Sequence, residues 1–143
     1  MDHKLKLMVV DDSPLFRTWL IRSLSEDDRF QVVGYAVNAL DAQEKIPLLQ
    51  PDMLTLDIEM PGMSGIDFLK QLLPVHPIPV ILVSSLNLRV FDALEAGAVD
   101  FVRKPDEANG LSKEIFLSML RSKLLVAAAS HVHLPSVPAS PQA

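Results

Sequence analysis

Polar side chains follow four apolar runs of this chain, each at the point where the run ends. They are Asp11 and Asp12 after 5–10, Asp57 after 53–56, Ser84 after 80–83, and Lys104 after 98–103. If the runs are parallel strands of one sheet, these side chains gather at its carboxyl edge, where open α/β sheets bind ligands. Three carboxylates at one place repel each other and call for a cation, whereas a hydroxyl and an ammonium suit a phosphoryl group. The spacing therefore predicts a site at which an aspartate is phosphorylated.

The elements that would position these residues alternate between strand-like and helix-like segments. Strands are expected at 5–10, 31–37, 53–57, 80–83 and 99–103, and helices at 14–25, 39–49, 64–73, 88–95 and from about 111 onward. Ser13, which precedes Pro14, and Asn38 are of the residue types that cap helix N-termini. Five strand–helix alternations predict βαβ units and a parallel sheet.

Composition limits the class of protein. The chain has 143 residues, of which 49% are hydrophobic, as expected for one domain whose sheet is covered on both faces. Its net charge of −5 argues against nucleic-acid binding by this domain. No apolar stretch is long enough to span a bilayer and no signal peptide is visible, so we expect a cytoplasmic chain without membrane association.

Four motifs resemble those of a response-regulator receiver domain. They are Val9-Val10-Asp11-Asp12-Ser13, the run from Leu56 to Gly65, Val83-Ser84-Ser85, and Phe101-Val102-Arg103-Lys104-Pro105. The resemblance implies an α/β fold of the flavodoxin-like (βα)5 type, with a doubly wound parallel five-stranded sheet in the order 2-1-3-4-5. Residues 1–125 would form the receiver domain. Residues 126–143 would form a helical extension and a Pro/Ser/Ala-rich linker or tail.

Within this family the chain looks most like the receiver of the chemotaxis protein-glutamate methylesterase. The runs 56–61, 84–85 and 97–102 carry this likeness. In that protein a receiver precedes a linker and a serine-esterase domain, so a C-terminal effector domain outside this chain is implied. The chain lacks a complete G-x-S-x-G motif, and we expect no esterase activity from it alone. A sensor histidine kinase is the implied phosphoryl donor.

The resemblance also implies roles for individual residues. Asp57 would accept the phosphoryl group, and Lys104 would pair with one of its oxygens. Mg²⁺ (or Mn²⁺) would be held by Asp11, Asp12, Asp57 and the backbone carbonyl of Glu59.

Two further expectations concern the state of the domain. Ser84 would donate its hydroxyl to the phosphoryl group on activation while Phe101 turns inward, which makes the two a switch. The Lys104–Pro105 peptide bond is expected to be cis.

Simpler interpretations remain beside these. Helix capping accounts for Ser84 on its own, and Phe101 is equally explained as a core aromatic. A phosphatase with an aspartate nucleophile is disfavoured because Asp11 and Asp12 are adjacent, whereas such enzymes usually carry two aspartates separated by one residue.

The segment from Leu86 to Ala96 is shorter than receivers usually carry. A phosphate-independent protein-interaction module is therefore the alternative function.

Overall fold

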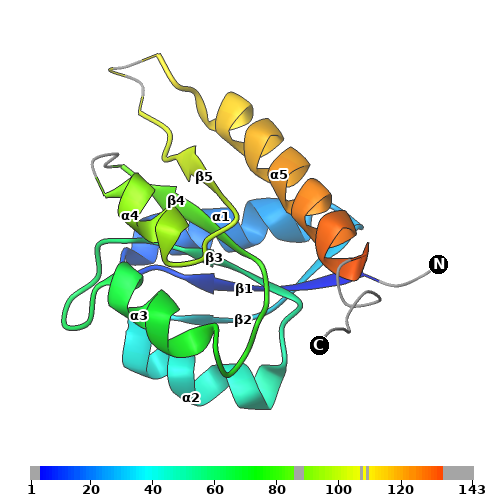
Figure 1. Cartoon of the computed structure of the whole chain (residues 1–143). Coiled ribbons are helices and arrows are strands. Elements are labelled where there is room, and N and C mark those ends of the chain that lie inside the picture. Colours follow the sequence, from blue (N-terminus) through cyan, green and yellow to red (C-terminus); the bar gives the residue numbers. More distant parts are fainter. Residues whose placement is uncertain (1–3, 86–88, 107, 109, 134–143) are drawn as a thin grey trace.

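Five parallel strands form one sheet in the order β2-β1-β3-β4-β5 (Figure 1). The computed structural model describes residues 4–85, 89–106, 108 and 110–133. The strands are β1 (Leu5–Val10), β2 (Phe30–Ala36), β3 (Met53–Leu56), β4 (Val80–Ser84) and β5 (Asp100–Arg103). The helices are α1 (Pro14–Ser25), α2 (Ala39–Leu49), α3 (Gly65–Leu72), α4 (Val90–Glu95) and α5 (Lys113–His133). The predicted flavodoxin-like α/β fold and its strand order are confirmed.

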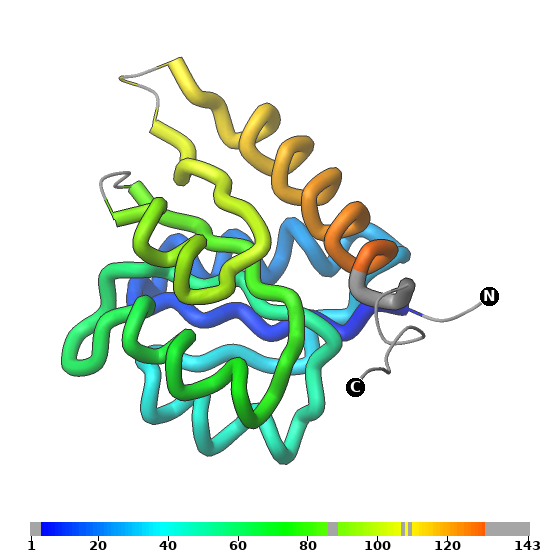
Figure 2. The backbone as a smooth tube through the Cα atoms, in the orientation of Figure 1, coloured from blue at the N-terminus to red at the C-terminus, as the bar shows by residue number. Residues whose placement is uncertain are grey.

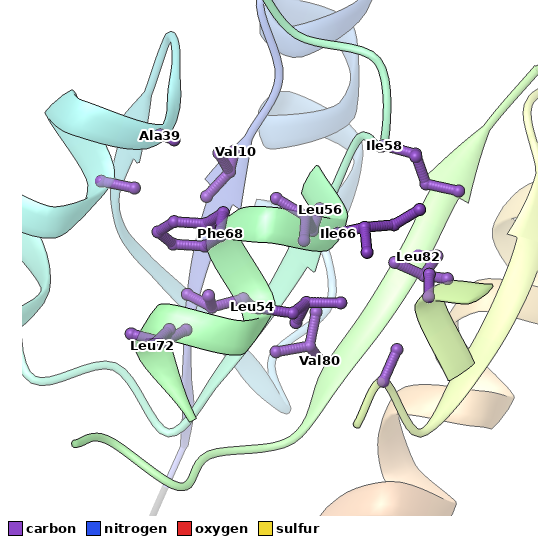
Figure 3. Close-up of a cluster of buried hydrophobic side chains, with 14 of the residues drawn as sticks. Val10, Ala39, Leu54, Leu56, Ile58, Ile66, Phe68, Leu72, Val80 and Leu82 are labelled. Atoms are coloured by element: carbon purple, nitrogen blue, oxygen red, sulfur yellow. The ribbon is translucent and has the colours of Figure 1, made fainter. Parts of the chain in front are cut away.

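Helices cover both faces of the sheet because successive strand residues point to opposite sides. Met8 and Val10 of β1 belong to the core beneath α2, α3 and α4, whereas Leu7 and Val9 belong to the core beneath α1 and α5. Figure 3 shows the first of these cores, in which Phe68 of α3 lies among side chains of the central strands. Burial on both faces explains why the central strands β3 and β4 read as nearly continuous apolar runs.

Local signals set the helix ends. The side chain of Ser13 caps α1, that of Asn38 caps α2, and that of Ser64 caps α3, each by accepting a backbone N–H of the first turn. Helix α2 continues two residues beyond Pro47, to Leu49, and is capped by Gln50, whose φ of 49° is left-handed. The expected caps at Ser13 and Asn38 are confirmed.

The register brings the ends of the strands level with one another. Val10 of β1 pairs with Leu56 of β3, and Leu56 in turn pairs with Leu82 of β4. The backbone of Asp57 donates to the carbonyl of Val10 at 3.0 Å, which extends this alignment one residue past β3. The tube in Figure 2 shows the chain leaving β1, β3, β4 and β5 on the same side of the molecule. The polar residues that follow these strands therefore meet at one edge.

The start of α4 and the end of α5 add to what the sequence predicts. Helix α4 begins at Val90 rather than at residue 88, and residues 86–88 lie outside the described part of the chain. Helix α5 extends to His133, well beyond residue 125, so the expected boundary between domain and extension falls inside one helix. Within the described ranges, none of the helices combines the length and apolar character that a membrane crossing requires.

Candidate functional site

Three carboxylates converge at the carboxyl edge of the sheet. Asp11 and Asp12 follow β1, Asp57 follows β3, and one oxygen from each lies within 4.8 Å of the others. Asp11 and Asp57 are buried, whereas Asp12 is exposed. The cluster therefore has a buried inner part and one carboxylate that faces solvent.

The ammonium of Lys104 enters this cluster from the loop after β5. Its Nζ lies 3.0 Å from Oδ2 of Asp11 and 3.3 Å from Oδ2 of Asp57. The Lys104 side chain is only 17% exposed, so both ion pairs are largely shielded from solvent. Its backbone N–H donates to the carbonyl of Ser84 at 3.0 Å, which fixes the start of the loop beside β4.

Backbone groups orient the two buried carboxylates. The N–H of Ser13 donates to Oδ1 of Asp11 at 2.8 Å, and the N–H of Glu59 donates to Oδ1 of Asp57 at 3.0 Å. Each carboxylate thus uses Oδ1 for the backbone and turns Oδ2 toward Lys104. A guanidinium N–H of Arg17 donates to the backbone carbonyl of Asp11 at 2.9 Å and ties α1 to the end of β1. These contacts restrict the directions in which the acidic side chains can turn.

Gly65 permits the close approach of α3 to the Asp57 segment. A Cβ at this position would lie 2.8 Å from the Cα of Ile58 and 3.0 Å from the carbonyl oxygen of Asp57. The N–H of Gly65 donates to the carbonyl of Ile58 at 2.9 Å. The loop after β3 therefore folds back on itself and fixes the position of Asp57 from the α3 side.

Burial dominates the electrostatics of Asp57. It raises the pKa of this carboxyl to about 6 from the ordinary 3.8; Lys104 opposes the rise and Asp11 adds to it. Burial lowers the pKa of Lys104, but the attraction of Asp57 and Asp11 outweighs this effect and raises it above its usual value. One ammonium is thus shared between two buried carboxylates, with Asp12 as a third acid nearby.

The residues of this cluster fit a hard divalent cation. Mg²⁺ and Mn²⁺ prefer oxygen ligands, and Asp11, Asp12 and Asp57 supply carboxylate oxygens close enough to share one ion. Such an ion would balance the negative charge that the single ammonium of Lys104 does not neutralise. The predicted contribution of the Glu59 carbonyl stays a prediction, because the observed contact of Glu59 is its N–H to Asp57.

Ser84 and Phe101 lie on the neighbouring strands β4 and β5. Ser84 is fully buried at the end of β4 and does not cap α4, which begins after Arg89. Phe101 is partly buried and packs against the core beneath α2, α3 and α4, while its carbonyl accepts a hydrogen bond from Lys123 at 2.7 Å. The proposed switching role of this pair stays a prediction.

The expected cis bond before Pro105 is wrong. No cis peptide bond occurs between described neighbours, and Lys104 and Pro105 are both described, so their bond is trans. The trans form is intrinsically favoured before proline by about 0.5–1 kcal/mol. In this conformation Lys104 already reaches both carboxylates.

Sequence reasoning missed one contact of the site. The Nζ of Lys104 lies 4.5 Å from the centroid of the Phe16 ring on α1. Phe16 and Trp19 are three residues apart, a spacing that places aromatic side chains on the same side of a helix. That spacing signals an aromatic cluster, but it does not show that the cluster meets a lysine from another loop.

Comparison with known proteins places the chain in a family. The model of the response regulator receiver domain matches residues 7–116. The chain belongs to this family.

The most informative relatives are methylesterases. The chain is 46% identical to protein-glutamate methylesterase/protein-glutamine glutaminase 2 of Syntrophomonas wolfei over 130 residues, and 43% identical to the protein of that name from Vibrio vulnificus over 136. These alignments include 91% and 92% of this chain but only 38% and 39% of the relatives. The chain thus spans less than half the length of the curated proteins that it matches.

Solved structures agree with this assignment. The response regulator domain of Thermotoga maritima CheB superposes with a TM-score of 0.78 at 36% identity, over 89% of this chain and 98% of that one. A chain from the crystal structure of the P1 domain of CheA3 in complex with CheY6 from R. sphaeroides superposes with a TM-score of 0.71 at 28% identity, over 87% of this chain and 97% of that one. The predicted likeness to the receiver of the chemotaxis methylesterase is confirmed.

Proposed function

We propose that this chain is a phosphorylation-activated receiver that accepts a phosphoryl group on Asp57 from a sensor histidine kinase. The observation that carries the proposal is the pairing of a buried carboxylate with Lys104 beside two further acids, at the edge where the parallel strands end. Membership of the receiver family supports the general activity.

In the proposed reaction an oxygen of Asp57 attacks phosphorus and forms an acyl phosphate. The bond from phosphorus to the donor nitrogen breaks, and its electron pair stays on the imidazole. A bound Mg²⁺ would supply neutralisation of the charge on the transferring group. Lys104 is placed to pair with a phosphoryl oxygen, because its Nζ already lies 3.3 Å from Oδ2 of Asp57. The N–H of Glu59 holds Oδ1 and so limits rotation of the nucleophile.

Intact-mass spectrometry after incubation with acetyl phosphate and Mg²⁺ tests this proposal. We expect one phosphoryl adduct in the wild-type chain and none in Asp57→Ala or without the metal. Asp28→Asn is the matched control, because Asp28 is an exposed carboxylate on the α1–β2 loop, outside the cluster. Absence of an adduct at short and long times would contradict the proposal and favour a phosphate-independent interaction module.

We further propose that the chain is the regulatory part of a chemotaxis methylesterase. Its similarity to methylesterases covers nine-tenths of its own length and about two-fifths of theirs, which leaves room in those proteins for a separate effector domain. A chimera tests this: the chain replaces the matching part of the Syntrophomonas wolfei relative. Methanol release from methylated receptor glutamates should rise with acetyl phosphate and Mg²⁺. It should not rise in the chimera that carries Asp57→Ala.

A further inference from the structure

An aromatic ring accompanies the two carboxylates around the Lys104 ammonium. Nζ of Lys104 lies 4.5 Å from the centroid of the Phe16 ring, 3.0 Å from Asp11 and 3.3 Å from Asp57. The face of an aromatic ring carries negative partial charge and attracts a cation within about 6 Å. The attraction is stronger away from water, and the Lys104 side chain is only 17% exposed. The ring therefore adds an attraction that an aliphatic side chain of similar size would not provide.

Asp11 and Phe16 lie in one short segment that runs from the end of β1 into the first turn of α1. The N–H of Ser13 donates to Oδ1 of Asp11 at 2.8 Å, while the hydroxyl of Ser13 accepts from the N–H of Phe16 at 3.5 Å. Arg17, the next residue on α1, donates to the carbonyl of Asp11 at 2.9 Å. These hydrogen bonds fix the ring relative to the carboxylate. Lys104 arrives from a different part of the chain and meets both.

Two further rings hold Phe16 in place. Its centroid lies 5.7 Å from that of Trp19 on α1 and 5.9 Å from that of Phe116 on α5. Trp19 and Phe116 are themselves 6.0 Å apart, and Phe116 is fully buried. Rings at these separations attract one another and restrict rotation. Phe16 is therefore a fixed surface, whereas Lys104 has a flexible four-carbon stem.

We propose that Phe16 is a positioning residue for Lys104 in phosphoryl transfer to Asp57. The inference rests on the proposed function and adds to it a residue that acts through the lysine. The ring holds the ammonium beside Oδ2 of Asp57, where a phosphoryl oxygen would need it. Without the ring, the ammonium would occupy this position for a smaller fraction of the time, and transfer would slow.

A spectroscopic measurement tests the contact itself. In metal-free protein carrying ¹³C-labelled lysine, the ring current of Phe16 should shift the ε-CH₂ protons of Lys104 upfield; Lys104→Met identifies the signal. We expect the shift to disappear in Phe16→Leu, which keeps an apolar side chain, and to persist in Phe16→Tyr, which keeps the ring. Phe16→Met serves as a second ring-free variant should Phe16→Leu not fold.

A kinetic measurement tests the consequence. Phosphorylation by acetyl phosphate with Mg²⁺ should be roughly fivefold slower in Phe16→Leu at saturating donor, as expected from a lost cation–π contact. Phe16→Tyr should recover most of the wild-type rate. Phe91→Leu is the matched control, because Phe91 is an exposed aromatic on α4 that belongs neither to the acidic cluster nor to the ring contact of Lys104. This control should react at the wild-type rate.

The proposal requires that ring-free variants lose the upfield shift of Lys104 and that they are phosphorylated more slowly. A ring-free variant with the wild-type Lys104 signal or the wild-type rate would overturn it, and so would a Phe16→Tyr variant as slow as Phe16→Leu. These outcomes leave the proposed function intact, provided that the wild-type chain is phosphorylated on Asp57. A wild-type chain that gains no phosphoryl group would instead contradict the proposed function, and the role of Phe16 would fall with it.

Discussion

Lys104 and Asp57 are 47 residues apart in the chain, yet Nζ of the lysine donates to Oδ2 of the aspartate at 3.3 Å. The parallel order of β3, β4 and β5 makes this meeting possible, because all three strands end at one edge. The same Nζ lies slightly closer to Asp11, at 3.0 Å. One positive charge is thus divided between two buried negative charges, and this imbalance determines how the domain should respond to metal, pH and mutation.

Removal of the Asp57 charge should stabilise the metal-free domain. Its pKa lies about two units above the ordinary value, which corresponds to an upper limit of about 3 kcal/mol of destabilisation at pH 7. We expect Asp57→Asn to raise the free energy of unfolding by about 1–3 kcal/mol in EDTA. Urea unfolding followed by circular dichroism measures this. Loss of stability in the variant would contradict the electrostatic account of the cluster.

Mg²⁺ should stabilise the wild-type domain, because an ion that binds only the folded state raises the melting temperature. Asp57→Asn and Asp12→Ala should each respond less, since each loses a carboxylate of the cluster. Thermal melts over a series of Mg²⁺ concentrations give the response. Asp28→Asn, which alters an exposed carboxylate outside the cluster, should respond as the wild type does.

The metal-free domain should lose stability as pH rises from about 4 to about 6. The folded pKa of Asp57 is about 6 and the ordinary value is 3.8, so between them the folded state binds the extra proton. The contribution of this group is present in full below pH 4 and is lost as pH rises through 6. Unfolding in urea at pH 5 and pH 7 with EDTA should show this. Subtracting the free energies of unfolding of Asp57→Asn from those of the wild type isolates the contribution of Asp57. If the free energy of unfolding changes equally with pH in the two proteins, Asp57 is not the cause of the pH dependence.

The sequence predicts the meeting of Asp11, Asp57 and Lys104 but not all of their surroundings. Strand periodicity and the order of elements are local signals, and parallel pairing converts them into one polar edge. The contact of Phe16 with Lys104 could not be predicted in this way, because it depends on how α1 packs over the sheet. The expected cis form of the Lys104–Pro105 bond is also wrong, because the identity of the two residues allows either isomer.

Gly65→Ala should disturb the site through the backbone. The new Cβ would lie 2.8 Å from the Cα of Ile58. This distance is too short for a contact between two carbon atoms, so either the start of α3 or the backbone at Ile58 must shift. We expect a loss of about 1–3 kcal/mol in unfolding free energy and weaker binding of Mg²⁺, because the carbonyl of Asp57 lies in the same contact. Gly34→Ala is the control, since its Cβ would meet only the end of the flexible Leu49 side chain. Mg²⁺ affinity equal to wild type in Gly65→Ala would show that the loop shifts without moving Asp57.

Lys104→Met should be more damaging to the metal-free domain than any of these changes. Methionine retains much of the apolar stem but leaves the carboxylates of Asp11 and Asp57 without their shared counterion. Uncompensated buried charge costs about 3–5 kcal/mol, and protonation of Asp57 limits the loss here to about 2–4 kcal/mol at pH 7. The loss should shrink at pH 5, and Asp57→Asn in the same chain should restore part of the stability, while the buried carboxylate of Asp11 stays without its counterion. A double-mutant cycle in urea measures this coupling; additive effects of the two substitutions would mean that Lys104 stabilises the fold independently of Asp57.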